Sequence, residues 1–100
     1  MDRPLPDELL SQEVDRRYRT FGPSRNPEQR ERRLQAARRG LEPAWQDVHR
    51  YGPTWARQTM IWLDRSRRDL LPGSPPPTAA RGYRTDDLGA VLSYLGEGLP

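Results

Sequence analysis

Six arginines between residues 25 and 40 are the groups of this sequence best suited to chemistry with another molecule. They share the stretch with only two acids, Glu28 and Glu31, so its local net charge is +4. The guanidinium group is planar, stays charged and presents a fork of N–H donors that matches phosphate and carboxylate oxygens. The stretch therefore predicts a surface for phosphates, with an acidic protein surface as the other ligand of the same chemistry.

The spacing of acids along the predicted helices indicates which arginines lack a local partner. An acid four residues before a base stabilises a helix, as for Glu13 and Arg17. Between residues 25 and 40, only Glu28 and Arg32 have this spacing. The nucleic-acid-binding residues that we predict are Arg30, Arg32, Arg33, Arg38 and Arg39, assisted by Arg57, Arg65 and Arg68.

The same arginine run has a simpler interpretation, which the sequence leaves open. All 17 basic residues are arginine, a bias that GC-rich codon usage in a bacterium or its phage would produce. A charge run on a helix is usually a solvated face, and acids from elsewhere in the fold can neutralise it. Asp64 and Asp69 also argue against base reading by the helix that carries them, because they place negative charge near the phosphates.

Residue types that catalysis or metal binding requires are scarce. There is no cysteine and a single histidine, His49, so no thiolate site and no pair of histidines can hold a metal. We expect His49 to be a packing residue on the apolar side of its helix. The adjacent acids Asp86 and Asp87 are explained by helix capping. The sequence therefore predicts a binding protein rather than an enzyme, with no cofactor, metal or catalytic residue.

These groups must be positioned by helices, and we predict an all-α fold: a small bundle of three to four helices with a C-terminal helix on a proline-rich linker. The first helix is expected over residues 7–20. Its apolar residues recur at helical spacing and form one face that contains Leu10, Val14, Tyr18 and Phe21.

The arginine-rich stretch is predicted to be a second helix, residues 27–39. Asn26 is a favourable N-cap, and Pro27 suits the first helical position. Gly40 is expected to end this helix in the left-handed conformation. Its apolar seam is thin, so most of its surface should face solvent.

The tryptophans fall in the next part of the chain. We predict a third helix over residues 43–51 and a fourth over residues 53–70, separated by Gly52-Pro53. A single helix over residues 43–70, kinked at the proline, is the alternative. The residues that step by three and four along this part include Trp45, Trp55 and Trp62, and we expect these indole rings to form the core.

The C-terminal part is predicted to be a separate unit. The chain divides into a helical domain (residues 1–71), a linker (72–84) whose prolines favour an extended conformation, and an amphipathic helix (85–100). This helix can fold back onto the core or dock on a partner. The partner-binding residues that we predict are Ile61, Leu88, Val91, Leu92 and Leu95.

Two functions follow from these features. The first is an accessory protein that binds the phosphates of DNA or RNA. The second is an adaptor or assembly subunit, for instance of a phage particle or a multi-subunit complex, which can form a homo-oligomer or a larger assembly. The N-terminus lacks the apolar run of a signal peptide, and the longest apolar run, Met60–Leu63, is too short to span a bilayer. We therefore expect a cytoplasmic protein without membrane contact.

Overall fold

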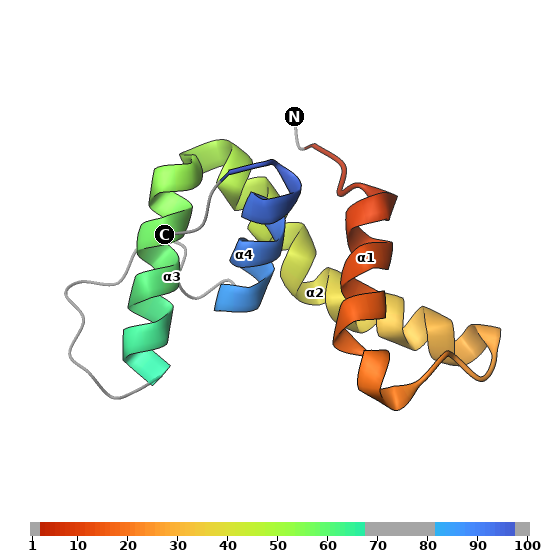
Figure 1. Ribbon diagram of the computed structural model, residues 1–100. Helices are drawn as coiled ribbons and strands as arrows, with labels where there is room; N and C mark the ends of the chain where they lie inside the picture. Colours follow the sequence, from red (N-terminus) through yellow and green to blue (C-terminus); the bar gives the residue numbers. More distant parts are fainter. Residues whose placement is uncertain (1–2, 68–81, 98–100) are drawn as a thin grey trace.

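Four α-helices pack together to form the molecule (Figure 1). The all-α prediction is confirmed, and no strand occurs within residues 3–67 and 82–97, which are those that the computed structural model describes, with the backbone alone for residues 65–67. The helices are α1 (Asp7–Arg17), α2 (Pro27–Tyr51), α3 (Pro53–Arg67) and α4 (Thr85–Tyr94), with a short 3₁₀ turn, η1 (Arg19–Phe21), after α1.

Like α4, the longest helix, α2, contacts all three of the other helices. It crosses the molecule behind α1 and α4 in the view of Figure 1, and α4 packs against it between α1 on one side and α3 on the other. Helices α1 and α3 do not contact each other. The arginine-rich half of α2 therefore has α1 as its main neighbour, whereas the other half also contacts α3 and α4.

The prediction that Gly40 ends a helix is wrong, because α2 continues without interruption from Pro27 to Tyr51. A glycine inside a helix costs about 1 kcal/mol relative to alanine, and Pro43 removes one helical N–H donor as well. Burial compensates for both, since Leu41 and Ala44 on either side of Pro43 are fully buried. Gly40 also has a packing role, because a Cβ there would collide with the carboxylate of Asp87 on α4.

The predicted break at Gly52-Pro53 is confirmed, and the alternative of one kinked helix over residues 43–70 is wrong. Gly52 has φ +95°, which favours glycine, and its N–H donates to Val48 O at 2.8 Å. Pro53 then occupies the start of α3, where its missing N–H costs nothing. The chain thus turns sharply and brings α3 alongside α4.

The first helix ends earlier than its apolar spacing indicates. Helix α1 stops at Arg17, and the chain tightens into the turn η1, which Gly22 ends with φ +79°. Leu10 and Val14 are buried as predicted, but Phe21 is 73% exposed. The change in helical twist after Arg17 turns the Phe21 ring away from the face that it would share in a continuous α-helix.

All four helices contribute to the core, with α2 and α4 at its centre. Trp45 is buried there, whereas Trp55 and Trp62 are only half-buried, so the expectation of three inward-facing indole rings holds fully for the first alone. The buried apolar residues are Leu9, Leu10, Val14, Ala37, Leu41, Ala44, Trp45, Val48, Ala56, Tyr83, Leu88, Val91 and Leu92.

Helix α4 folds back into this core. Tyr83, which the sequence assigns to the linker, is also buried, and its ring lies edge-on to that of Trp55 with centroids 6.4 Å apart. The anchored segment therefore begins before α4 itself. Most of the predicted linker, up to residue 81, lies outside the described residues.

Candidate nucleic-acid interface

The N-terminal half of α2, residues 27–39, starts from a well-defined cap. Asn26 Oδ1 accepts a hydrogen bond from Gln29 N at 2.8 Å, and Gln29 Oε1 accepts one from Arg25 N at 2.6 Å. Pro27 occupies the first helical position, as predicted. A cap of this type stabilises a helix by about 1 kcal/mol, so the arginines that follow project from an ordered support.

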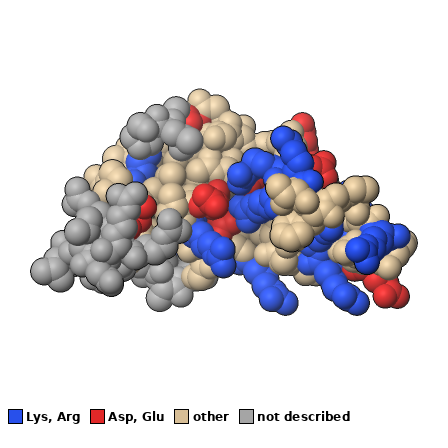
Figure 2. Space-filling view, turned by 60° about the horizontal axis from the view of Figure 1, so that its bottom comes forward, with Lys and Arg blue, Asp and Glu red and all other residues tan. Residues whose placement is uncertain are grey.

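Four of the predicted arginines are exposed on this half of α2. Within the described chain none of them forms an ion pair, and even the favourably spaced Glu28 and Arg32 do not pair. Figure 2 shows one face of the molecule. On the half of that face where α1 and the start of α2 lie, basic side chains gather, and several of them project into solvent. The four exposed arginines on this half of α2, named here the exposed α2 arginines, are Arg30, Arg32, Arg38 and Arg39.

Arg33 has a different role from its neighbours. It is half-buried, its Nη1 donates to Gly22 O at 2.8 Å, and its guanidinium carbon lies 5.0 Å from the centroid of the Tyr18 ring. A cation over an aromatic face is attracted to it. Arg33 therefore fastens the turn after α1 to α2, and its donors are partly used within the fold.

Of the three predicted arginines of the fourth helix, Arg57 is the one whose side chain the structure describes. Arg57, on α3, lies 3.5 Å from Glu97 in an ion pair near the end of the described chain. The backbone of Arg65 belongs to α3, but its side chain is outside the described residues, as is all of Arg68. Helix α3, which carries Arg57, and the start of α2 lie at opposite ends of the molecule (Figure 1).

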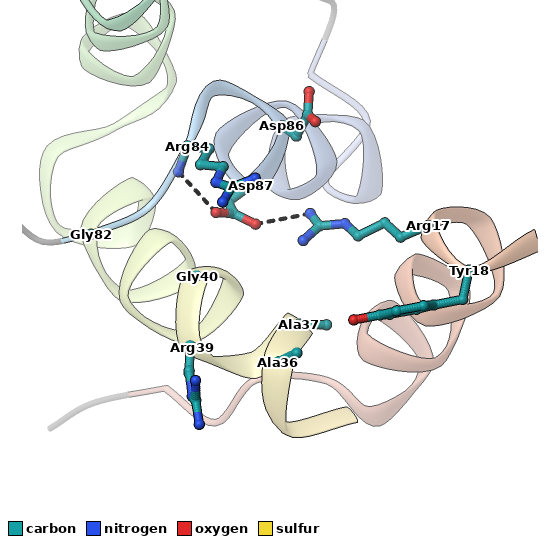
Figure 3. A pocket seen from close by; sticks show the side chains of 10 residues that line it. All are labelled: Arg17, Tyr18, Ala36, Ala37, Arg39, Gly40, Gly82, Arg84, Asp86 and Asp87. Carbon is teal, nitrogen blue, oxygen red and sulfur yellow. Dashed lines mark hydrogen bonds and ion pairs between the residues drawn. The ribbon is translucent and has the colours of Figure 1, made fainter. Parts of the chain in front are cut away.

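A groove of about 530 Å³ opens between α1, α2 and the start of α4 (Figure 3). Arg17 and Asp87 point toward each other across it, and Arg17 Nη2 donates to Asp87 Oδ1 at 2.8 Å. Asp87 also accepts from Arg84 N at 2.8 Å, and Arg84 is the N-cap of α4, so the capping role predicted for this acid is confirmed. Among the arginines that line the groove, Arg39 points away from Asp87 in Figure 3.

Both arginines of α1 are paired with carboxylates. Glu13 accepts hydrogen bonds from Arg16 at 2.7 Å and from Arg17 at 3.1 Å. Burial alone would raise the pKa of Glu13, but the hydrogen bonds and positive charges of the two arginines outweigh it and hold this pKa below its ordinary value. The hydrogen bond to Glu13 likewise raises the pKa of Arg16. These arginines are therefore already partnered, unlike the exposed α2 arginines.

The predicted partner-binding residues separate into two groups. Leu88, Val91 and Leu92 are fully buried against the molecule's own helices, so they are core residues in this structure rather than an open docking face. Ile61 is 46% exposed and Leu95 is 39% exposed. Two separate side chains of this kind are ordinary for a protein surface.

His49 lies where a packing residue is expected. Its Nδ1 is 2.8 Å from Trp45 O, and its ring centroid lies 4.2 Å from that of Trp45. No group of three or more metal-binding side chains occurs among the residues whose positions are described. The sequence-based prediction of a non-enzymatic protein stays a prediction.

Comparison with known proteins adds no relative on which a function could rest. Neither protein-family models, nor curated proteins, nor solved structures give a significant match to this chain. Among the described helices, none is both long enough and apolar enough to cross a membrane.

Proposed function

We propose that this protein binds nucleic acid by contacting its phosphates with the exposed α2 arginines. The observation that carries the proposal is the contrast in pairing: four exposed guanidinium groups have no carboxylate partner in the described chain, whereas those of α1 are held in ion pairs. Unpaired arginine retains its donors for the bidentate contact that phosphate oxygens favour.

The arrangement favours backbone contact over base reading. Arg32 and Arg39 are seven residues apart, two turns of helix, so they project on the same flank about 10 Å from each other along the axis. They border the same shallow hollow on α2, which Glu28 and Glu31 also line. Phosphate contacts fix position but carry no sequence information. The expected activity is therefore sequence-independent binding of a polyanion, which depends strongly on salt.

The test is fluorescence anisotropy with a labelled oligonucleotide of mixed sequence over a salt series. The double variant Arg32→Gln/Arg39→Gln should reduce affinity and lower the salt slope by about 1.4 for a single strand or about 1.8 for a duplex, because each neutralised phosphate contributes about 0.7 or about 0.9. Both side chains are exposed, so the variant should remain folded, which circular dichroism checks.

A charge-matched control tests whether the affinity depends on this local surface or on the total charge of the protein. Arg16→Gln/Arg57→Gln removes the same charge from two arginines that are ion-paired, with Glu13 and Glu97. Although the sequence groups Arg57 with the assisting residues, its helix lies at the other end of the molecule from the start of α2 (Figure 1), so this variant should change the affinity far less. Equal losses in both double variants, or no complex at low salt, would contradict the proposal. The adaptor function lacks the open surface predicted for it, because the apolar face of α4 is buried. Nuclease-resistant capture of an acidic protein would instead support that function.

A further inference from the structure

Phe21 is the most exposed of the large apolar side chains in the described chain, at 73%. Phenylalanine usually buries its ring, because the ring removes a large apolar area from water. Phe21 belongs to η1, in the corner where the chain passes from α1 to the arginine-rich half of α2 (Figure 1). This corner is the same end of the molecule as the exposed α2 arginines.

The turn that carries Phe21 is held in place at several points. Phe21 N donates to Tyr18 O at 3.0 Å, and Gly22 N donates to Arg19 O at 3.3 Å. Arg33 fastens Gly22 and Tyr18 to α2 through the contacts described above. The Tyr18 and Phe21 rings are tilted by 52° with centroids 6.0 Å apart. An exposed aromatic ring on a braced turn is pre-organised for contact, which lowers the entropic cost of binding.

Positive charge surrounds this turn. A hollow of about 480 Å³ borders it, and Arg19, Arg30 and Arg33 line the hollow together with one acid, Asp15. Arg19 and Arg30 are exposed, and neither forms an ion pair with a described carboxylate. The Phe21 ring does not line this hollow itself, but it packs beside the ring of Tyr18, which does. An aromatic platform next to a hollow lined by arginines is the combination that holds single strands, in which bases stack on the ring while cations follow the backbone.

We propose that Phe21 stacks on an unpaired base, so that the ligand of the exposed α2 arginines is a single-stranded nucleic acid. This inference rests on the proposed function and refines its substrate class. A base within a duplex has both faces covered by its neighbours, whereas an unpaired base in DNA or RNA offers a free face. Arg30 lines the hollow beside the turn and is placed to contact the adjoining phosphate.

The experiment measures anisotropy at one fixed low salt concentration with an oligonucleotide as single-stranded DNA, as single-stranded RNA of the same sequence, and as duplex DNA. The single strands should bind more tightly than the duplex. Phe21→Ala should weaken single-strand binding by about 5- to 100-fold while leaving duplex binding and the salt slope unchanged, since no charge is removed. Phe21→Tyr should restore single-strand binding, because it keeps the ring.

Two further variants make the outcome decisive. Ile61→Ala removes an exposed apolar side chain from α3 and should leave binding unchanged, whereas Phe21→Leu keeps the apolar character without a ring and should bind as weakly as Phe21→Ala. Full activity of Phe21→Leu or Phe21→Ala overturns the stacking role, and docking of Phe21 in a protein pocket then becomes the better explanation. If Arg32→Gln/Arg39→Gln weakens binding while Phe21→Ala does not, this inference fails alone; absence of any complex overturns the proposed function with it.

Discussion

The two halves of α2 belong to one continuous helix but have opposite surroundings. In residues 27–39, Ala37 is the one buried residue, and the exposed arginines project around it. Residues 41–51 contribute five buried residues, because α3 and α4 pack on them. Those five are Leu41, Ala44, Trp45, Asp47 and Val48.

This contrast explains how a small domain can combine a stable fold with an open surface. The cap at Asn26 supports the exposed half locally, and tertiary burial supports the other half despite Pro43. Most helical stability in proteins comes from packing, so the exposed half can carry like charges without unfolding the molecule. The loss of folding stability caused by a substitution should therefore change sharply near Gly40, where the two halves meet.

The largest effect is expected in the buried half. Trp45 is 6% exposed, and its ring packs against those of His49 and Tyr94. Trp45→Ala should lower the free energy of unfolding by about 3–5 kcal/mol, a large part of the about 5–15 kcal/mol that a domain possesses. Urea denaturation followed by circular dichroism measures this loss. A change below about 1 kcal/mol would show that the buried half does not hold the fold together.

The next effect concerns Gly40, at the boundary between the two halves of α2, where the sign of the stability change on substitution by alanine is informative. In an open helix, glycine to alanine is stabilising by about 1 kcal/mol. Gly40→Ala should instead destabilise by about 1–3 kcal/mol, because the new methyl group meets the Asp87 carboxylate that Arg17 and Arg84 hold in place. Thermal and urea denaturation of the single variant would check the direction.

Gly89 on α4 is the matched control for this substitution. A Cβ there would lie 3.5 Å from Met60 Cε, an ordinary contact, so Gly89→Ala should be neutral or stabilising. The Gly40→Ala penalty should also shrink in an Asp87→Ala background, since the colliding carboxylate is then absent and the two effects are not additive. An undiminished penalty in that background would assign the cost to something other than Asp87.

Local patterns in the sequence predict the fold class and several boundaries. The cap at Asn26, the break at Gly52-Pro53 and the apolar face of α4 each depend on residues close together in the chain, and all three are confirmed. The exposure of Arg30, Arg32, Arg38 and Arg39 also follows from the thin apolar seam of their helix.

Contacts between distant residues could not be predicted in this way. A glycine that ends a helix and one that admits a neighbouring helix look the same in sequence, and the reason for Gly40 is Asp87, far along the chain. The Arg17–Asp87 ion pair likewise joins residues 70 positions apart. Phe21 was assigned to the wrong surface because its apolar spacing assumes that α1 continues, whereas a 3₁₀ turn intervenes. Whether the exposed arginines bind nucleic acid stays a prediction.

The smallest of these effects compares a partnered acid with an unpartnered one. Glu13 is buried between Arg16 and Arg17, whereas Glu28, on the exposed half of α2, forms no ion pair with a described residue. The lowered pKa of Glu13 in the folded state means that its carboxylate adds stability above its unfolded pKa of about 4.3. That contribution is lost as the pH falls through the lower, folded-state pKa.

Glu13→Gln should therefore cost about 1 kcal/mol near neutral pH, and the difference from the wild type should diminish as the pH is lowered from about 5 to about 3. Glu28→Gln removes the same charge from a solvated position and should cost less than about 0.5 kcal/mol at every pH. Urea midpoints of the three proteins across this range give the comparison. Parallel curves for wild type and Glu13→Gln would mean that its two arginines do not stabilise the ionised carboxylate, and the contrast between paired arginines on α1 and unpaired arginines on α2 would lose its energetic basis.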